Sequence, residues 1–423
     1  MATDLNRELL REAGLLVGEA ATAGPNDLVL AVDAEDDGAL AFAEELLRQP
    51  KDTSTSAERA APKSLRSAHR ADPQAQLAMI SVPGQYAAAE ARQALAEGLH
   101  VFLFSDNVPI EDEVALKRSA RERGLLVLGP DCGTAIINGV GLGFANVVRR
   151  GTIGVVGASG TGIQEVTSLV HRAGSGISHA IGTGSRDLHS AVGGITTLQA
   201  LDLLRDDPST QSIVLISKPS DPLVASTVLR ALTATGKPSV AYLQGAHAEA
   251  PDGVRLARNL EEAAHLALGM PADEPAPNPR ATGLVCGLFC GGTLLEEAAL
   301  ALGHAVEHQL IDFGDDQYTR GRAHPMIDPT LRNQAIVDAG RDTRVCVVLL
   351  DFILGLGAHP DPVGAALPAI GEALSAGRGR GLRFVAHVVG TDEDPQGLRR
   401  QEAALRAAGV EVLDSNFRAA LAA

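Results

Sequence analysis

The chain contains 423 residues, of which 45% are hydrophobic and 45 are glycines, and its formal net charge is −16 at pH 7. This charge disfavours nonspecific binding to nucleic acid or to an anionic membrane, because a phosphate surface would repel the protein on average. No apolar run reaches the roughly 18–20 residues that cross a bilayer, and the first residues lack a basic stretch followed by an apolar core. We therefore expect a cytoplasmic protein with no nucleic-acid or membrane partner, and the length predicts three domains.

The first segment, 1–147, is predicted to form a Rossmann-like domain. An apolar strand is expected at 28–32 and a helix at about 37–48. Residues 50–75 are rich in Ser, Thr, Lys, Arg and Pro without an apolar period, which indicates a mobile surface insertion. Three strand–helix units follow after residue 77. A glycine-rich loop of the Gly-x-Gly-x-x-Gly kind is missing after their first strand, so a dinucleotide site is poorly supported.

A short glycine-containing turn occurs twice, each time between an apolar strand and a helical period. The first copy is Ser159-Gly160-Thr161, and the second is Gly291-Gly292-Thr293, 132 positions later; Glu165 and Glu297 follow at the same spacing. Glycine lets the backbone approach an anion, and the first N–H groups of the following helix can bind phosphate or carboxylate without a charged side chain. We therefore predict two phosphate-binding turns.

The similarity between the two halves extends beyond these turns. The segment 181–187 resembles 311–317, and the strand 213–216 resembles 347–350, at offsets of 130 and 134 positions. A nearly constant offset predicts an internal duplication. The alternative is that the glycines serve only close packing of helices on strands, as in any α/β protein.

The rest of the chain is predicted to form two α/β domains with parallel sheets, at 148–270 and 282–423. Short apolar runs alternate there with Ala- and Leu-rich helical periods. The closely spaced prolines at 271–281 indicate a linker between them. Four cysteines provide no disulfide framework, and Cys286 and Cys290 lack a second ligand pair, so we predict buried thiols and no metal site.

Several motifs resemble the α subunit of succinyl-CoA synthetase, namely the segments 129–132, 157–161 and 207–210. The Gly291-Gly292-Thr293 unit resembles the ligase domain of that enzyme's β subunit, fused behind it. The FdrA family of acyl-CoA-synthetase-like proteins is more similar still, through the segments 104–108, 157–165, 192–195 and 315–333. This resemblance implies a Rossmann-like domain of the CoA-binding type, followed by two flavodoxin-like domains with parallel sheets.

The resemblance also implies chemistry, but the chain departs from the synthetase pattern. In succinyl-CoA synthetase the two turns stabilise a phosphohistidine on a Gly-His-Ala-Gly-Ala loop, whereas His247 is the one candidate here, and the steadying glutamate is replaced near Lys218. FdrA proteins resemble components of oxamate carbamoyltransferase. This implies that carbamoyl phosphate and a small carboxylate, oxamate, interconvert with oxalurate and phosphate, in an oligomer with co-encoded partner subunits.

A polar cluster near residue 322 is the next candidate for ligand binding, because fixed guanidinium groups suit carboxylate or phosphate oxygens. Arg322 is predicted to clamp an anion, assisted by Arg332. His324 is predicted to donate a proton or a hydrogen bond to the carbamoyl oxygen. The alternative is a loop braced by ordinary ion pairs and a capping histidine.

Three further residues are candidate ligands. Lys218 is predicted to neutralise phosphate charge, unless it is a surface residue. Asp187 and Asp315 follow glycine-containing strand ends, where they could orient an amide nitrogen or simply cap the next helices. Both interpretations remain open. No cofactor is required, although an acyl phosphate could bring Mg²⁺ with it.

Three functional classes follow. The first is a carbamoyltransferase subunit that needs no covalent enzyme intermediate. The second is an ADP- or GDP-forming acyl-CoA synthetase, which would use coenzyme A and require a phosphorylated His247. The third is a non-catalytic sensor of anions or acyl-CoA that retains the two turns.

Overall fold

The computed structural model describes residues 7, 10–11, 14, 16–23, 29, 62–245, 249–271 and 283–423. The chain separates into two compact units, of which the first comprises Met1–Lys63 with Arg320–Ala323, and the second comprises Ser64–Thr319 with His324–Ala423. The described part of the first unit contains the short 3-10 helix η1, Gly18–Thr22. The strand and helix predicted before residue 50 fall almost wholly outside the described residues, as does most of the predicted linker.

The second unit begins with a small helix in a segment that was predicted to be a mobile insertion. Helix α3, Leu65–Ala71, is closed at its start by a capping box: Ser67 N–H donates to the Ser64 hydroxyl, and Ser64 N–H donates to the Ser67 hydroxyl at 3.0 Å. Reciprocal capping satisfies two helix-end donors, which explains a helix without an apolar period. Residues 51–61 of the predicted insertion lie outside the described part.

A three-stranded parallel sheet follows, in the order β1-β2-β3. Its strands are β1 Leu77–Ile80, β2 His100–Leu103 and β3 Val127–Leu128, connected by α4 Gly84–Ala96 and α5 Ile110–Glu122. Alanines line the buried face of α4 and let the helix lie close to the strands. The three predicted strands are therefore present, the first two each followed by its helix and the third by a loop.

A seven-stranded sheet forms the middle of the chain, in the order β10-β9-β8-β6-β7-β4-β5. Its strands are β4 Thr134–Ile137, β5 Val140–Gly143, β6 Arg150–Gly157, β7 Ile177–Gly182, β8 Ser212–Ser217, β9 Ser239–Leu243 and β10 Val254–Leu256. All neighbours are parallel except at β4, which runs antiparallel to β5 and β7. The chain enters this sheet at Thr134, before the domain boundary predicted at 147.

The last sheet has five parallel strands in the order β12-β11-β13-β14-β15. Its strands are β11 Leu284–Phe289, β12 His308–Asp312, β13 Val345–Ile353, β14 Arg383–Val389 and β15 Glu411–Leu413. Numbered within the domain, this order is 2-1-3-4-5. The five parallel strands β6 to β10 follow the same order, which is the flavodoxin-like arrangement. The predicted α/β class and the two flavodoxin-like domains are thus confirmed.

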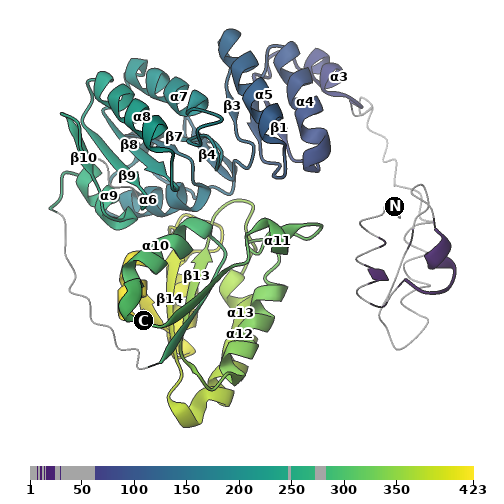
Figure 1. The fold of residues 1–423 in the computed structure, drawn as a ribbon, viewed down its shortest axis with the longest axis vertical. Helices are drawn as coiled ribbons and strands as arrows, with labels where there is room; N and C mark the ends of the chain where they lie inside the picture. Colours follow the sequence, from purple (N-terminus) through teal and green to yellow (C-terminus); the bar gives the residue numbers. More distant parts are fainter. Residues whose placement is uncertain are drawn as a thin grey trace. The chain divides into compact units, whose positions relative to one another are not determined.

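Helices cover both faces of each flavodoxin-like sheet (Figure 1). The middle domain has α6 Gly160–Arg172, α7 Ile195–Asp206, α8 Pro222–Ala234 and α9 Leu260–Ala267. The last domain has α10 Gly292–Leu302, η2 Gly303–Ala305, α11 Asp316–Thr319, α12 Thr330–Arg341, α13 Pro362–Gly377, η3 Arg378–Arg380, α14 Leu398–Ala407 and α15 Asn416–Ala422. Helices α6 and α9 lie on one face of the seven-stranded sheet, and α7 and α8 lie on the other.

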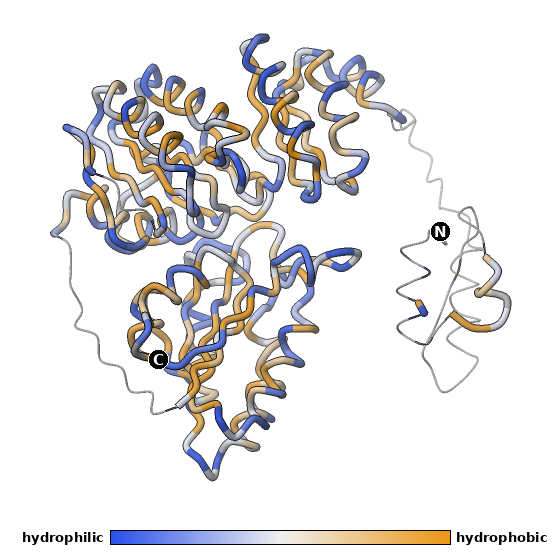
Figure 2. The backbone as a smooth tube through the Cα atoms, in the orientation of Figure 1, coloured by the Kyte–Doolittle hydropathy of each residue, from blue (hydrophilic) through white to orange (hydrophobic). Residues whose placement is uncertain are grey.

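One hydrophobic core runs through both flavodoxin-like domains. Ile163 and Val166 of α6 belong to the same buried cluster as Leu294 and Ala298 of α10. Figure 2 shows the strands as the most hydrophobic parts of the fold, with hydrophilic residues on the outer helices. The duplicated helices α6 and α10 therefore pack at the centre, and their first turns meet there. In the described residues, no helix is long and apolar enough to cross a membrane.

Candidate anion site between two helix N-termini

The two predicted phosphate-binding turns face each other. The hydroxyl of Ser159, the N-cap of α6, lies 2.7 Å from the hydroxyl of Thr293 in the first turn of α10. A Cβ added at Gly291 would lie 2.8 Å from Thr161 Cγ2, closer than real Cβ atoms approach. The close approach of the Thr161 side chain therefore favours glycine at residue 291. The structure brings all six predicted turn residues together.

Both turns present open amides. The N–H groups of Gly160 and Thr161 in α6, and of Gly292 and Thr293 in α10, make no hydrogen bond with any other described residue. Each stands at the positive end of a helix of more than ten residues. Unpaired amides and helix dipoles together favour an anion at this place.

Asp351, a residue of β13, stabilises the second turn through hydrogen bonds. Its carboxylate accepts N–H groups from Cys290 at 2.8 Å and Gly291 at 3.0 Å. Arg332, which is 2% exposed, donates to the Asp351 carboxylate at 3.1 Å and to its carbonyl at 2.6 Å, and lies over the ring of Phe352. Arg332, a predicted ligand residue, therefore supports the turn from within the core.

Lys218 and Asp312 flank the start of α10. A Cβ added at Gly292 would lie 2.6 Å from Asp312 Oδ2 and 3.7 Å from Lys218 Nζ. Lys218 follows β8, and its ammonium group makes no direct hydrogen bond or ion pair with another described residue. Burial raises the pKa of Asp312 to about 6, against the opposing effects of the Gly314 N–H and of Lys218. The predicted phosphate partner Lys218 is thus at the second turn, and its ammonium group is available.

His324 lies beside Asp312, but in a form that limits its chemistry. Burial lowers the pKa of His324 to about 4, so the ring is neutral near pH 7. Met326 N–H donates to its Nδ1 at 3.2 Å, which assigns the proton of the neutral ring to Nε2. Both Nε2 and Asp312 Oδ1 lie within about 3.1 Å of the position that a Cβ on Gly314 would occupy. His324 is therefore suited to donate a hydrogen bond rather than a proton.

The other predicted site residues have different places. Asp187 is fully buried and accepts hydrogen bonds from Lys117 Nζ at 2.7 Å and from Thr197 N–H at 2.8 Å, which fixes the start of α7. Asp315 is exposed and accepts Gln317 N–H at 3.0 Å, which caps α11. For both residues the structure shows the capping role. Arg322 is exposed and belongs to the first compact unit, so its role as an anion clamp remains a prediction.

The duplicated glutamates lie beneath the turns and join the two domains. Glu165 of α6 accepts Asn416 N–H at 3.2 Å, at the start of α15 in the other domain. Glu297 of α10 accepts Leu260 N–H at 2.7 Å, at the start of α9 in the other domain, and Asn416 Nδ2 at 2.7 Å. Each carboxylate thus caps the last helix of the opposite domain. This crossed arrangement holds the two turns in register.

Two histidines of the last domain already use ring nitrogens in hydrogen bonds. His387 is 1% exposed, and its two ring nitrogens contact Glu165 at 2.8 Å and the Leu413 carbonyl at 3.0 Å. The neutral His324 uses its Nδ1 for Met326. His247 lies outside the described residues.

The described residues also do not fit two possible cofactors. They contain no group of three or more His, Cys, Asp or Glu side chains that could hold a metal ion. The loops after β1 and β2 begin Ser81-Val82-Pro83 and Phe104-Ser105-Asp106, so neither provides a glycine-rich cradle for a pyrophosphate. We therefore derive no step through a metal ion or coenzyme A.

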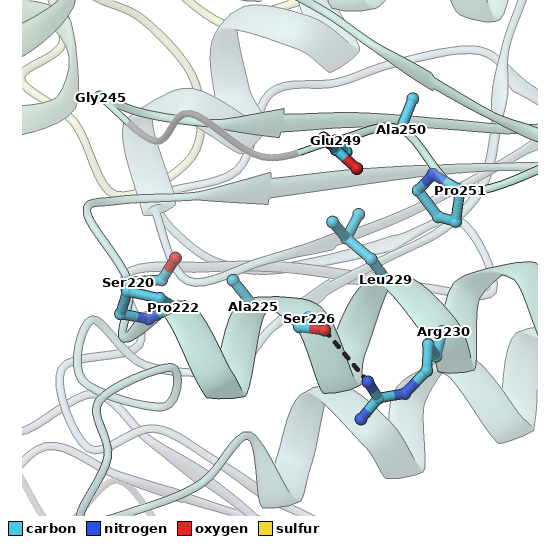
Figure 3. A pocket seen from close by; sticks show the side chains of 10 residues that line it. All are labelled: Ser220, Pro222, Ala225, Ser226, Leu229, Arg230, Gly245, Glu249, Ala250 and Pro251. Carbon is cyan, nitrogen blue, oxygen red and sulfur yellow. Dashed lines mark hydrogen bonds between the residues drawn. The ribbon is translucent and has the colours of Figure 1, made fainter.

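A separate cavity of about 680 Å³ lies along α8, near the turns but apart from them (Figure 3). Its lining includes Leu229, Pro251 and Arg230, whose guanidinium group bonds the Ser226 hydroxyl at 3.1 Å. Lys218 and the six turn residues do not line it. The chemistry-bearing groups therefore gather at the helix N-termini rather than in this cavity.

Comparison with known proteins agrees with this architecture. The CoA-ligase family matches residues 288–423, the CoA binding domain family matches 148–245, and the family described as "AllF, heavy metal-associated domain" matches 1–63. Residues 1–63 contain no cysteine and no histidine, so they lack the soft ligands that heavy metals prefer.

Individual relatives extend the comparison. Alpha subunit 2 of the ADP-forming succinate–CoA ligase of Archaeoglobus fulgidus is 28% identical to this chain. The matched region covers 43% of this chain and 62% of that subunit. The solved apo structure of the dinucleotide-forming acetyl-coenzyme A synthetase 1 of Ca. Korarchaeum cryptofilum is 16% identical, with a TM-score of 0.38 over 82% of this chain and 81% of that one. The uncharacterized protein YahF of Escherichia coli K12 is 41% identical over 100% of this chain and 91% of its own length. The chain, which matches the AllF, CoA-binding and CoA-ligase families in this order, belongs to the family of YahF.

Proposed function

We propose that this chain is the phosphate-binding subunit of a carbamoyltransferase. In the proposed reaction, carbamoyl phosphate and oxamate give oxalurate and phosphate reversibly, together with co-encoded partner subunits. The observation that carries the proposal is the convergence of two open helix N-termini, joined by the 2.7 Å contact between the hydroxyls of Ser159 and Thr293, with the ammonium group of Lys218 beside the second. Such a site suits a free acyl phosphate better than a phosphoenzyme.

Each part of the site has a task in this proposal. The amides of Gly160 and Thr161 bind phosphate oxygens, and Lys218 neutralises charge as the phosphate leaves. His324 Nε2–H donates a hydrogen bond to the carbamoyl oxygen, on which negative charge develops during attack. A preorganised neutral donor can stabilise that charge without losing its proton.

Two similarities support the reaction class. The first segment matches the AllF domain family, and the chain resembles FdrA proteins, which are similar to components of oxamate carbamoyltransferase. Lys218 also stands where a succinyl-CoA synthetase has a glutamate that steadies its phosphohistidine. A cation at that place favours a bound dianion over a phosphorylated imidazole.

The test is reconstitution. The purified chain with its co-encoded partners, carbamoyl phosphate and oxamate should release phosphate and form oxalurate in equal amounts. Without oxamate, phosphate release should fall to the rate of spontaneous hydrolysis. If neither product forms in the complete mixture, the proposal is wrong.

An acyl-CoA ligase is the second candidate, favoured by the matches to the CoA-ligase and CoA-binding families. It requires a phosphorylated histidine, for which His247 is the candidate. Incubation with radiolabelled ATP and a nucleotide-binding partner chain would label the protein, and His247→Ala would abolish the label. An unlabelled wild-type protein excludes this mechanism.

A sensor is the third candidate. Two results together would favour this function. Carbamoyl phosphate or inorganic phosphate would raise the melting temperature of the protein, and the protein would convert neither carbamoyl phosphate nor oxamate with any partner.

A further inference from the structure

Asp312 differs from Asp351 and Asp187, the two fully buried aspartates described above. It is the last residue of β12, and its Oδ1 accepts Gly314 N–H at 2.8 Å. Its Oδ2 makes no hydrogen bond with any residue in the described ranges and faces the first residue of α10, Gly292. Asp351 and Asp187, by contrast, are saturated by amide, hydroxyl or cationic partners. One oxygen of Asp312 is therefore fixed, and the other is free at the anion site.

The proposed reaction needs a group of this kind. The attacking atom is an amide nitrogen, which is a weak nucleophile until it loses a proton. As the nitrogen bonds to the carbamoyl carbon, the bond between that carbon and the phosphate oxygen breaks, and its electron pair stays on the phosphate. The proton lost by nitrogen must reach an acceptor close to both groups.

We infer that Asp312 is the proton-transfer residue of this site, accepting the proton of the attacking amide nitrogen and passing it to the departing phosphate. This inference rests on the proposed carbamoyl transfer. Lys218 at the same helix end is placed to hold the phosphate beside Asp312. His324 Nε2–H, near the opposite carboxylate oxygen, is placed to orient the carbamoyl group.

The charges around Asp312 fit such a role. Lys218 favours its ionised form, whereas Asp351 from β13 and Asp315 from the following loop disfavour it, and the neighbouring His324 is neutral at pH 7. Together with burial these groups bring the pKa of Asp312 to about 6. A carboxylate with that pKa is ionised at neutral pH and can accept and return a proton with little loss of driving force.

The experiment compares the full wild-type chain with Asp312→Asn, both assembled with the partner subunits. Asparagine keeps the size of the side chain and the acceptor for Gly314 N–H. We expect kcat to fall by about 100-fold or more, in the range of lost general base catalysis, with the KM for carbamoyl phosphate changed less than about threefold. The matched control Asp338→Asn, on the exposed face of α12, should keep the wild-type rate.

The pH profile gives a second readout. Wild-type activity should fall as the pH decreases through about 6, and Asp312→Asn should lose this acidic limb. Asp312→Glu, which retains a carboxylate, should recover part of the rate. Calorimetric titration with inorganic phosphate should give similar affinities for wild type and Asp312→Asn at pH 8.

The outcomes separate the two proposals. A wild-type assembly without carbamoyl transfer overturns the proposed function, and the inference with it. An active wild type with an Asp312→Asn variant that keeps more than a fifth of kcat, or keeps the acidic limb, overturns the role of Asp312 alone. A variant that loses phosphate binding and turnover in equal measure makes Asp312 a binding residue, which also overturns the inference.

Discussion

The first and second anion turns have the same topology but different electrostatic surroundings. At the first turn Ser159 caps its own helix, and no carboxylate in the described part of the chain accepts a hydrogen bond from the amides of Gly160 and Thr161. At the second, Asp351 binds two backbone amides, and Asp312 faces Gly292. The duplication therefore supplied two equivalent frames. Under the proposed function, the first turn binds the anion, and the second brings a carboxylate of the protein to it.

The largest expected effects come from the two duplicated glutamates, Glu165 and Glu297, which hold the two turns in register. Glu165→Ala removes a buried carboxylate and leaves His387 and Asn416 N–H without their partner. We expect the free energy of unfolding to fall by about 3–5 kcal/mol. Chemical denaturation at pH 7 measures it.

Its control is Glu372→Ala, which breaks an exposed pair with Arg341 and should cost less than about 1 kcal/mol. Similar losses in the two variants would contradict the special role of the crossed contact between the domains.

The second glutamate makes stability depend on pH. Burial raises the pKa of Glu297 to about 7 from an ordinary value of 4.5. Between these values the unfolded chain releases a proton that the folded chain keeps, so the free energy of unfolding falls as the pH rises, by on the order of 3 kcal/mol.

Glu297→Gln cannot titrate and should remove this slope. Denaturation of both proteins at intervals from pH 4.5 to pH 6.5 tests it, below the range in which His387, whose pKa is raised by Glu165, loses its proton. Parallel curves for the two proteins would refute the assignment.

Turn geometry gives a smaller effect. Ser159 and Gly291 occupy equivalent positions, but only the first tolerates a side chain, because a Cβ at Gly291 would meet Thr161. Gly291→Ala should push the turns apart and cost about 1–3 kcal/mol of stability, with weaker binding of inorganic phosphate in calorimetry.

The matched variant Gly371→Ala places a methyl group in open space on α13 and should stabilise the fold by about 0.5–1 kcal/mol. A Gly291→Ala protein as stable as wild type would mean that the turns do not need this approach.

The smallest expected effect concerns binding alone. Lys218 has no direct partner in the described part of the chain, so Lys218→Met should leave the melting temperature unchanged and weaken inorganic phosphate binding by about tenfold. Lys237 is its opposite, since its ammonium group donates to the carbonyls of Leu204 and Asp207.

Lys237→Met should lower the melting temperature and leave phosphate affinity unchanged. Calorimetry should therefore show weaker phosphate binding only for Lys218→Met. Thermal unfolding should show a lower melting temperature only for Lys237→Met. Unaltered affinity in Lys218→Met would remove Lys218 from the site.

Local signals in the sequence predicted much of this fold. Apolar runs followed by glycines located the strands and both turns, and the constant offset predicted the duplicated flavodoxin-like domains. One local signal was overlooked, because Asn138-Gly139 joins β4 to β5 with both residues at positive φ, as a tight hairpin requires. That hairpin extends the middle sheet beyond its predicted start.

The parts of the site that were missed depend on contacts between distant residues. Asp351 is the one carboxylate in the apolar strand β13, and it was not singled out from the sequence. A carboxylate in such a buried run indicates that it has a hydrogen-bonding or cationic partner there. Asp312 lay inside the repeated segment 311–317 and was not singled out there. The contact between Glu165 and Asn416 joins residues 251 positions apart, and no periodicity in a single sequence specifies such a pairing.

The crossed capping of α9 and α15 has a consequence for how the two domains stay together. Because each domain supplies the carboxylate that completes the other, a chain cleaved between residues 271 and 283 would have to reassemble as a bimolecular complex. In the intact chain the covalent connection holds each domain at an effective concentration in the millimolar range relative to the other, as for a short tether, so their association does not depend on protein concentration. Activity of the cleaved protein should then vary with dilution, whereas that of the intact chain should not.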